Sequence, residues 1–431
     1  MTPQTHWRRG IRANLHILAN AGSLVGAMAI NSGLGFIYWW LAARLFVPTA
    51  VGLASASVSA MVLLGNAGML GFGTLLLGEL PRRPGHAPGL IASALLVAGC
   101  LGTVLGLLFA RLAPVISPEL GILADGSDST ALFGVGVGLA SVTLVLDQAL
   151  VGLARGGLQL RRNVVFASAK LLTLGAIGFW WPSAPALAIY GTWVAGFVVS
   201  LFSLGKILGL GRWLRERPRL EWRLLRSLVP SAIGHHALNL VLQTPGLVLP
   251  LVVTAILSAE MNASFYVAWM VASLVFVAPD SLSVVLFNAN AADQAKLASQ
   301  LRLVLALSAA IGVAANLAMW LLAAPLLGLF GAGYGVASDS LRLLTVAVFP
   351  LIVRDYFVAL RRISGRVAAT AGLLAAGGLL ELTLAAMGAT YGGLTGLTLG
   401  WLAALCVEAV LMSPVVVRAA RQQQPAEAMA Q

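Results

Sequence analysis

The chain has 431 residues, of which 59% are hydrophobic and only 10% are charged. A soluble domain carries roughly a quarter charged residues, so the composition excludes an ordinary soluble protein and indicates an integral membrane protein. The net charge of +12 does not indicate a nucleic-acid partner, because the basic residues gather in loops between apolar segments. The sequence contains no nucleophile elbow, P-loop or HExxH motif. We therefore expect no enzymatic activity, no cofactor and no metal.

Twelve stretches of about 20 mostly apolar residues predict transmembrane helices. The expected fold class is an all-α integral membrane protein, with twelve helices in two six-helix lobes. The first stretch, 20–43, is too long for the apolar region of a signal peptide, so we expect an uncleaved span there. The predicted spans are 20–43, 51–77, 88–110, 131–153, 163–181, 186–205, 229–256, 263–287, 303–324, 338–360, 367–389 and 391–413.

A strongly basic stretch from Lys206 to Arg226 divides the apolar chain into halves of equal length. Because each half holds six predicted spans, any structural repeat between them is a parallel one, with an axis along the membrane normal. The expected domains are an N-terminal lobe (1–205), a basic cytoplasmic linker (206–228), a C-terminal lobe (229–413) and a cytoplasmic tail (414–431).

Lysine and arginine are distributed unevenly between the two sides of the predicted bundle. The loops and termini on the side of the central basic stretch carry most of the 27 Lys and Arg, whereas the opposite side carries only Arg44 and Arg111. Short basic loops stay on the cytoplasmic side of a membrane. Both termini are therefore predicted to be cytoplasmic.

Ionisable residues within membrane spans are costly, so each is a candidate functional residue. Asp147 and Lys170 lie at the same predicted depth, about 10 Å below one loop, and form a candidate ion pair that is either structural or an ion-coupled switch. Arg342 and Arg354 lie near the two ends of one span. Glu381 lies nearest to mid-membrane among the acids, whereas Asp280 and Glu408 lie closer to the predicted inner end.

Four polar residues of the seventh span, His235, His236, Asn239 and Gln243, fall within about 100° of arc on a helix. Such a stripe either lines a water-filled cavity or makes hydrogen bonds between helices. Zinc binding is not expected, because adjacent histidines point in different directions. On the first span, Asn31 shares a face with Asn20.

Several short motifs together resemble the polysaccharide-biosynthesis, O-antigen-type flippases of the multidrug/oligosaccharidyl-lipid/polysaccharide exporter (MOP) superfamily. This superfamily also holds the lipid II flippases and the multidrug and toxic-compound extruders. The motifs are FIYWWLAARLFVPTAVG at 36–52, Leu80-Pro81, Leu249-Pro250, Phe265-Tyr266 followed by Ala268, and LFGAGY at 329–334 before Arg361.

The resemblance implies a V-shaped transporter in a bacterial-type inner (plasma) membrane. Such a protein moves an undecaprenyl-pyrophosphate-linked glycan from the inner to the outer leaflet by alternating access. The lipid II branch places arginines on the first and eighth spans, facing the cavity. This chain has no Lys or Arg in 20–43 or 263–287, so that site is not carried over.

On this interpretation, the candidate substrate-binding residues are Lys170, Arg342, Arg354, His235, His236, Asn239, Gln243 and Asn31. The candidate ion-coupling residues are Asp147, Glu381 and Asp355, with H+ or Na+ as the ion. The other implied partners are membrane lipids and polysaccharide-assembly machinery. The main alternative is an ion-coupled exporter of drugs or small metabolites, which would rely on the acids. A glycan polymerase or ligase is less favoured, because the longest predicted outer loop has no histidine.

Overall fold

The structure is a computed structural model that describes residues 33–208, 220–290 and 297–421. Asn31, most of the predicted first span and parts of the predicted linker and tail lie outside these ranges. The described part is built of helices and contains no strand, so the predicted all-α membrane fold class is confirmed.

Residues 33–45 are helical and precede the first labelled helix. The longer helices that follow are α2 (Pro48–Gly68), α3 (Phe72–Glu79), α4 (Ala87–Ile116), α5 (Gly126–Gly152), α6 (Gly156–Trp180), α7 (Ala186–Leu208), α9 (Trp222–Ile256), α10 (Ala259–Asn290), α11 (Leu297–Gly328), α12 (Ser338–Val346), α13 (Val348–Ile363) and α14 (Val367–Arg421). Short 3-10 turns are η1 (Pro84–His86), η2 (Pro118–Leu123) and η3 (Ala332–Ala337).

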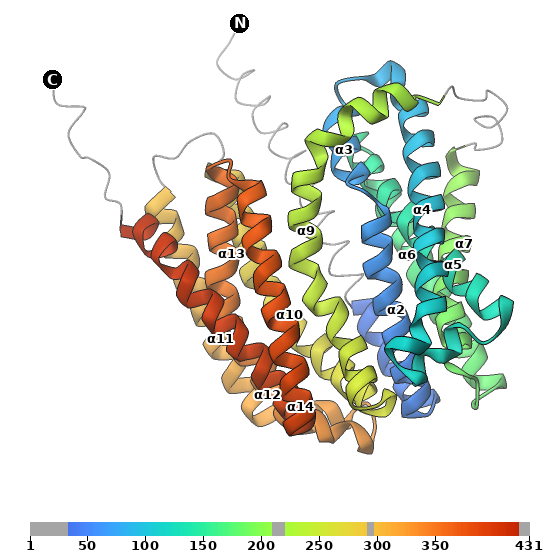
Figure 1. The fold of residues 1–431 in the computed structure, drawn as a ribbon, viewed down its shortest axis with the longest axis vertical. Coiled ribbons are helices and arrows are strands. Elements are labelled where there is room, and N and C mark those ends of the chain that lie inside the picture. The colour runs from blue at the N-terminus through green and yellow to red at the C-terminus, as the bar shows by residue number, and fades with distance from the viewer. Residues whose placement is uncertain (1–32, 209–219, 291–296, 422–431) are drawn as a thin grey trace, which may run out of the picture. The chain divides into compact units, whose positions relative to one another are not determined.

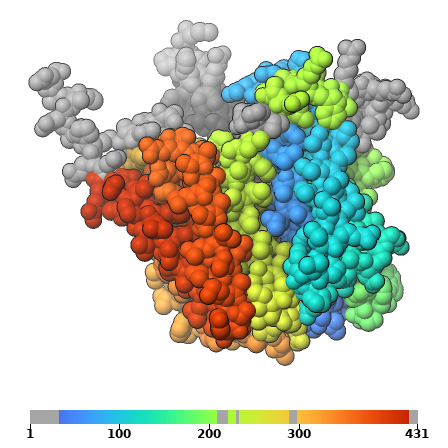
Figure 2. All heavy atoms as spheres, viewed as in Figure 1, coloured from blue at the N-terminus to red at the C-terminus, as the bar shows by residue number. Residues whose placement is uncertain are grey.

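Within the described ranges, ten helical stretches are long and apolar enough to cross a membrane. The last of them, α14, is two helices joined by a kink at Gly392 and Gly393, which separates the predicted spans 367–389 and 391–413. Gly393 has φ 58°, a conformation that glycine adopts readily. Large apolar side chains of α4 such as Leu96, Val104 and Leu108 point outward, and α4 forms part of the surface in Figure 2. Lipid is the medium that accepts such a surface without cost.

The chain forms two compact units, and α2, α4 and α9 each contribute residues to both. The first unit comprises 33–46, 64–112 and the described parts of 122–233. Its helices α4 and α5 approach closely through small residues, since a Cβ added to Gly106 would lie 2.8 Å from the Cα of Gly134. The start of α9 is tied to this unit by the backbone N–H of Glu221, which donates to Ser93 Oγ at 2.9 Å.

The second unit comprises 47–63, 113–121 and the described parts of 234–421. Within it, α10 packs against α11, α12 and α13, and α13 packs against α14 (Figure 1). Tyr356 of α13 anchors the core, because its hydroxyl is buried and donates to the carbonyl of Val304 at 3.1 Å. The separation into two lobes joined by a linker over 206–228 stays a prediction. In the structure, α9 begins at Trp222, within the predicted linker, and α14 continues to Arg421, within the predicted tail.

Within the second unit, α2 lies directly on the start of α10. Asn262 Nδ2 donates to the Gly52 carbonyl at 2.8 Å, and a Cβ at Gly52 would lie 2.6 Å from the Ala259 carbonyl carbon. The obstructing atoms belong to backbone, which cannot rotate away. Glycine is therefore required at this position, where the motif that resembles the flippases ends.

We predict that Gly52→Ala destabilises the protein by about 1–3 kcal/mol, the usual cost of overpacking. Gly372→Ala on α14 is the matched control, because a Cβ there has no neighbour within 4 Å and alanine favours helix. Thermal unfolding of the purified protein in detergent measures both effects. Equal midpoints for the two variants would contradict the close approach of α2 and α10.

Candidate functional site

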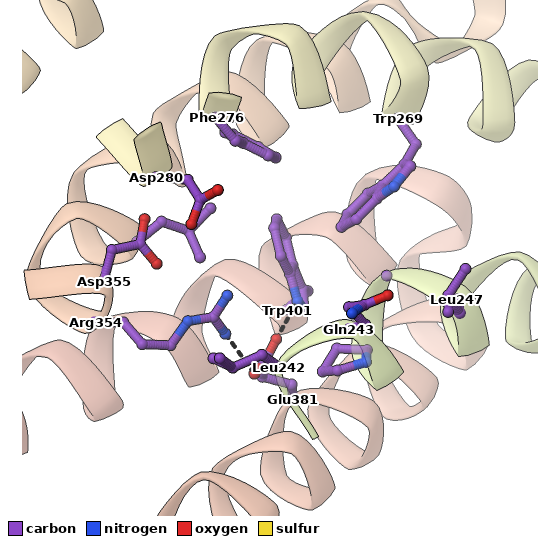
Figure 3. Close-up of a pocket in the computed structure, with 13 residues that line it drawn as sticks. Leu242, Gln243, Leu247, Trp269, Phe276, Asp280, Arg354, Asp355, Glu381 and Trp401 are labelled. Carbon is purple, nitrogen blue, oxygen red and sulfur yellow. Dashed lines mark hydrogen bonds and ion pairs between the residues drawn. The ribbon is translucent and has the colours of Figure 1, made fainter. Parts of the chain in front are cut away.

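A polar pocket of about 400 Å³ lies inside the second unit (Figure 3). This volume is within the range of small-molecule sites. Residues of α9, α10, α13 and α14 line the pocket, so side chains far apart in sequence share one space. Its polar and aromatic lining residues are Gln243, Asp280, Arg354, Asp355, Glu381, Trp269, Phe276 and Trp401.

Arg354 and Glu381 form a buried ion pair at one wall of this pocket. Arg354 Nη1 lies 3.1 Å from Glu381 Oε1, and the two side chains are 12% and 2% exposed. Trp401 Nε1 donates a hydrogen bond to the second carboxylate oxygen of Glu381 at 2.6 Å. Both oxygens of Glu381 are thus occupied, while Arg354 Nε has no hydrogen-bond partner among the described residues. The guanidinium keeps donor capacity beside the pocket.

Asp280 of α10 and Asp355 of α13 also line the pocket, and their labelled side chains lie near each other in Figure 3. Neither carboxylate has an ion pair with a residue of the described ranges. The same two acids line a small adjoining cavity together with Arg362. The pocket thus presents three carboxylates and one arginine, a balance that favours a bound cation or proton.

Glu408, on the second half of α14, is 4% exposed, and neither of its carboxylate oxygens has a hydrogen-bond partner among the described residues. Its Oε1 lies 2.5 Å from the position of a Cβ at Gly377, so the carboxyl group rests directly on the backbone of the first half of α14. Burying an unpartnered carboxylate is costly. Glu408 is a polar residue of this unit that sequence reasoning did not rank as a site.

In the first unit, the expected ion pair between Asp147 and Lys170 is wrong. Asp147 instead binds Arg162 through both carboxylate oxygens, at 2.7 Å to Nε and 2.6 Å to Nη2. The predicted spans place Arg162 in the loop before 163–181, but α6 begins at Gly156. Arg162 is therefore well inside the helix and only 4% exposed, where a bidentate guanidinium is the stronger partner for a carboxylate.

Lys170 of α6 is buried among aromatic rings rather than beside an acid. Its Nζ lies 4.0 Å from the ring centre of Trp193, 4.9 Å from that of Phe166 and 5.0 Å from that of Tyr38. The ring faces attract the ammonium group, and this attraction is stronger away from water. Lys170 is 4% exposed and makes no ion pair or hydrogen bond through Nζ with the described residues. Lys170 does not line the polar pocket of the second unit.

The third candidate cation, Arg342 of α12, does not line the pocket. It pairs with Asp339 one helical turn away at 2.8 Å, and its guanidinium stacks on Trp320 at 5.7 Å. Its side chain is 30% exposed. The structure thus places Lys170 in the first unit and Arg354 in the pocket of the second, and leaves Arg342 in a local contact.

The four polar residues predicted to form a stripe on α9 have different surroundings: one lines the pocket and one makes a hydrogen bond between helices. Gln243 lines the pocket, whereas Asn239 accepts a hydrogen bond from Arg362 Nη2 of α13 at 2.9 Å. His235 is exposed and His236 is buried, and neither lines the pocket. Asn31 lies outside the described residues.

Sequence reasoning did not select Asp280, Arg162, Arg362 and Trp401 as site residues. The two arginines were assigned to loops because each stands beside another arginine, Arg161 or Arg361. If the helix had been extended in the prediction to include Arg161 and Arg162, its periodicity would have placed one of them on the buried face and the other on the exposed face. Arg162 is buried and Arg161 exposed, which follows from their 100° separation on the helix.

Comparison with solved structures relates the fold of this chain to the folds of known transporters. A structure described as the inward-facing conformation of a multidrug resistance MATE family transporter of the MOP superfamily aligns with 90% of this chain and 94% of its own, with TM-score 0.69 and 15% identity. The lipid II flippase MurJ in an inward closed conformation aligns with 91% of this chain and 86% of its own, with TM-score 0.69 and 12% identity. The chain has the fold of these MOP superfamily proteins.

An outward-facing MATE structure also aligns, with TM-score 0.58, 16% identity and 96% coverage of both chains. No protein-family model and no curated protein matches the sequence. At these identities the likeness extends to the fold and not to individual site residues. The transporter-type fold that the sequence motifs imply is thereby found in the structure.

We predict strong coupling between Asp147 and Arg162 in stability measurements. Asp147→Asn or Arg162→Met alone leaves a buried charge without its partner and costs about 3 kcal/mol or more. The double variant should be less destabilised than the sum of the two single changes, as measured by thermal unfolding in detergent. Asp147→Asn combined with Lys170→Met is the matched control and should be additive. Additivity in the first pair, or coupling in the second, would overturn the assignment of the ion pair.

Proposed function

We propose that this protein is a membrane transporter that flips a polyprenyl-pyrophosphate-linked oligosaccharide from the inner to the outer leaflet, by alternating access, for polysaccharide biosynthesis or export. The observation that carries the proposal is Lys170. It is a buried ammonium group held by three rings with no acid bound to it among the described residues. A cation without a counter-ion in a low-dielectric interior is suited to an anionic group such as a phosphate.

Two further observations support this proposal. The fold is shared with a protein described as a lipid II flippase, and the motifs at 36–52 and 329–334 resemble polysaccharide-biosynthesis flippases. The rings of Tyr38, Phe166 and Trp193 form a cage around Lys170 Nζ. Tyr38 belongs to the motif at 36–52. Its hydroxyl is fixed by Thr192 Oγ1 at 2.6 Å and by the Ile189 carbonyl at 3.1 Å. The cage is therefore preorganised, which lowers the entropy lost when a ligand binds.

The acids of the second unit supply candidates for ion coupling. Asp147 is paired with Arg162 and Glu381 with Arg354. Among the predicted coupling residues, Asp355 is therefore the one without an ion pair in the described ranges, and Asp280 lines the same pocket. Binding of H+ or Na+ to this group would change its net charge and hence the stability of the Arg354 ion pair. We propose that this change biases the transporter between its two access states.

The alternative is an ion-coupled exporter of drugs or small metabolites. One observation favours it, namely the pocket in which three carboxylates and three aromatic rings surround a single arginine. Such a composition suits a cationic aromatic compound. The two functions differ in which charge contacts the substrate: Lys170 for the phosphate-linked lipid, and the acids for the drug.

We predict that Lys170→Gln abolishes surface glycan in a null strain while the protein level stays normal. Lys170→Arg should retain partial function, because it keeps the charge. Lys206→Gln is the matched control, since this exposed lysine lies over the ring of Phe202 at the end of α7. Surface polysaccharide and inner-leaflet glycan-lipid are measured in the complemented strains. A null strain with normal surface glycan and increased sensitivity to a cationic drug would support the exporter and refute the flippase.

The proposed ion coupling makes a separate prediction for Asp355. In proteoliposomes, Asp355→Asn should remove the dependence of transport on a proton or sodium gradient, because the group that binds the ion is neutral. Asp339→Asn is the matched control, since Asp339 is 70% exposed and belongs to a local pair with Arg342. An unchanged gradient dependence in Asp355→Asn would exclude Asp355 as a coupling residue and leave the Lys170 prediction intact.

A further inference from the structure

A second cavity, of about 570 Å³, lies in the first unit between α4, α5 and α7. Its lining residues are aliphatic, prolyl or glycyl with one exception, and Arg155 is the sole charged residue among those that the structure describes there. This composition contrasts with the polar pocket of the second unit. A cavity with such walls in a membrane bundle accommodates hydrocarbon and excludes ions.

The cavity follows the helices for about the thickness of one leaflet. Its end at Ala87, where α4 begins, and at Leu153, which directly follows α5, adjoins the exposed Arg155 and is called the mouth. Along α5 it extends from Leu153 inward to Val142, which is about 17 Å at 1.5 Å per residue. Half of the hydrocarbon core of a bilayer is about 15 Å thick. The depth thus matches one acyl chain that enters from the membrane surface.

The basic residues around the mouth differ in what they bind. Arg83 pairs with Glu79 at 2.9 Å, as does Arg82 at 3.5 Å, and Lys206 lies over the ring of Phe202. Arg155 is exposed, and its guanidinium makes no ion pair or hydrogen bond with the described residues. Arg155 therefore adds an unpaired positive charge to the lining of an apolar cavity.

We propose that this cavity binds one acyl chain of a phospholipid with a single negative charge, whose phosphate lies at Arg155. Arg155 is the one charged residue among the described lining residues and matches a monoanionic headgroup, whereas a pyrophosphate carries more charge than one arginine neutralises. The occupant is therefore a resident lipid of the leaflet at this end of the helices. This site does not depend on the transport proposal, since the lipid is bound and not carried across.

Native mass spectrometry of the purified full-length protein tests the site. The protein is exchanged into micelles with either palmitoyl-oleoyl phosphatidylglycerol or the zwitterionic phosphatidylcholine that has the same chains. We expect one molecule of phosphatidylglycerol to be retained, and Arg155→Gln to weaken its retention about fivefold, the effect of one basic residue near an anionic headgroup. Arg161→Gln is the charge-matched control, because Arg161 is also exposed but does not line the cavity.

A second pair of variants tests the hydrocarbon part. Leu95→Trp adds an indole to the wall of the cavity, whereas Leu96→Trp adds the same group to the outward face of α4, where Leu96 is 49% exposed. Leu95→Trp should abolish retention of both lipids, and Leu96→Trp should leave it unchanged. Should Leu95→Trp fail to fold, the arginine pair still decides the proposal.

Three results would overturn it. Equal retention in Arg155→Gln and Arg161→Gln would assign the effect to general surface charge. Competition by free glycerol phosphate as effective as that by the lipid would show an anion site without a chain. Unchanged retention in a folded Leu95→Trp protein would show that the chain lies elsewhere and that another occupant, such as a segment of this protein, fills the cavity.

Discussion

The cost of placing a charge inside a membrane bundle determines how the side chains of this protein are arranged. Each buried ionic group needs a partner close enough to offset the hydration it loses. Asp147 and Arg162 meet this requirement with two short hydrogen bonds, and Arg354 and Glu381 meet it with an ion pair that Trp401 completes. Both ion pairs join helices that follow one another in the sequence, α5 with α6 and α13 with α14.

The groups left without a partner of opposite charge are the ones that define the proposed functions. Lys170 is stabilised by ring faces, which attract a cation without neutralising its charge. Asp280 and Asp355 share a pocket whose arginine is already bound to Glu381. The first arrangement suits an anion and the second suits a cation or a proton. The first arrangement lies in the first unit and the second arrangement lies in the second unit.

Paired arginines show where sequence reasoning reached its limit. The predicted spans leave Arg161 and Arg162 in the loop before 163–181, and Arg361 and Arg362 in the loop after 338–360. In the structure one member of the first pair is buried against Asp147, and Arg362 donates to Asn239 of α9. Hydropathy averages over a window and cannot separate two neighbours that point 100° apart on a helix. The sequence identifies Asp280 as an ionisable residue within a span, but its place beside Asp355 in the pocket depends on the packing of α10 against α13.

The sequence alone determined that this is an all-α membrane protein, where most of the spans lie and that Lys170, Arg354, Asp355 and Glu381 are the charged groups to examine. Those conclusions follow from hydropathy and from the cost of burying charge, which are properties of each segment by itself. Only the tertiary structure decided which charges meet. An ion pair depends on helix start, rotation and neighbour, so a helix that begins at Gly156 brings Arg162 to Asp147 and leaves Lys170 among aromatic rings.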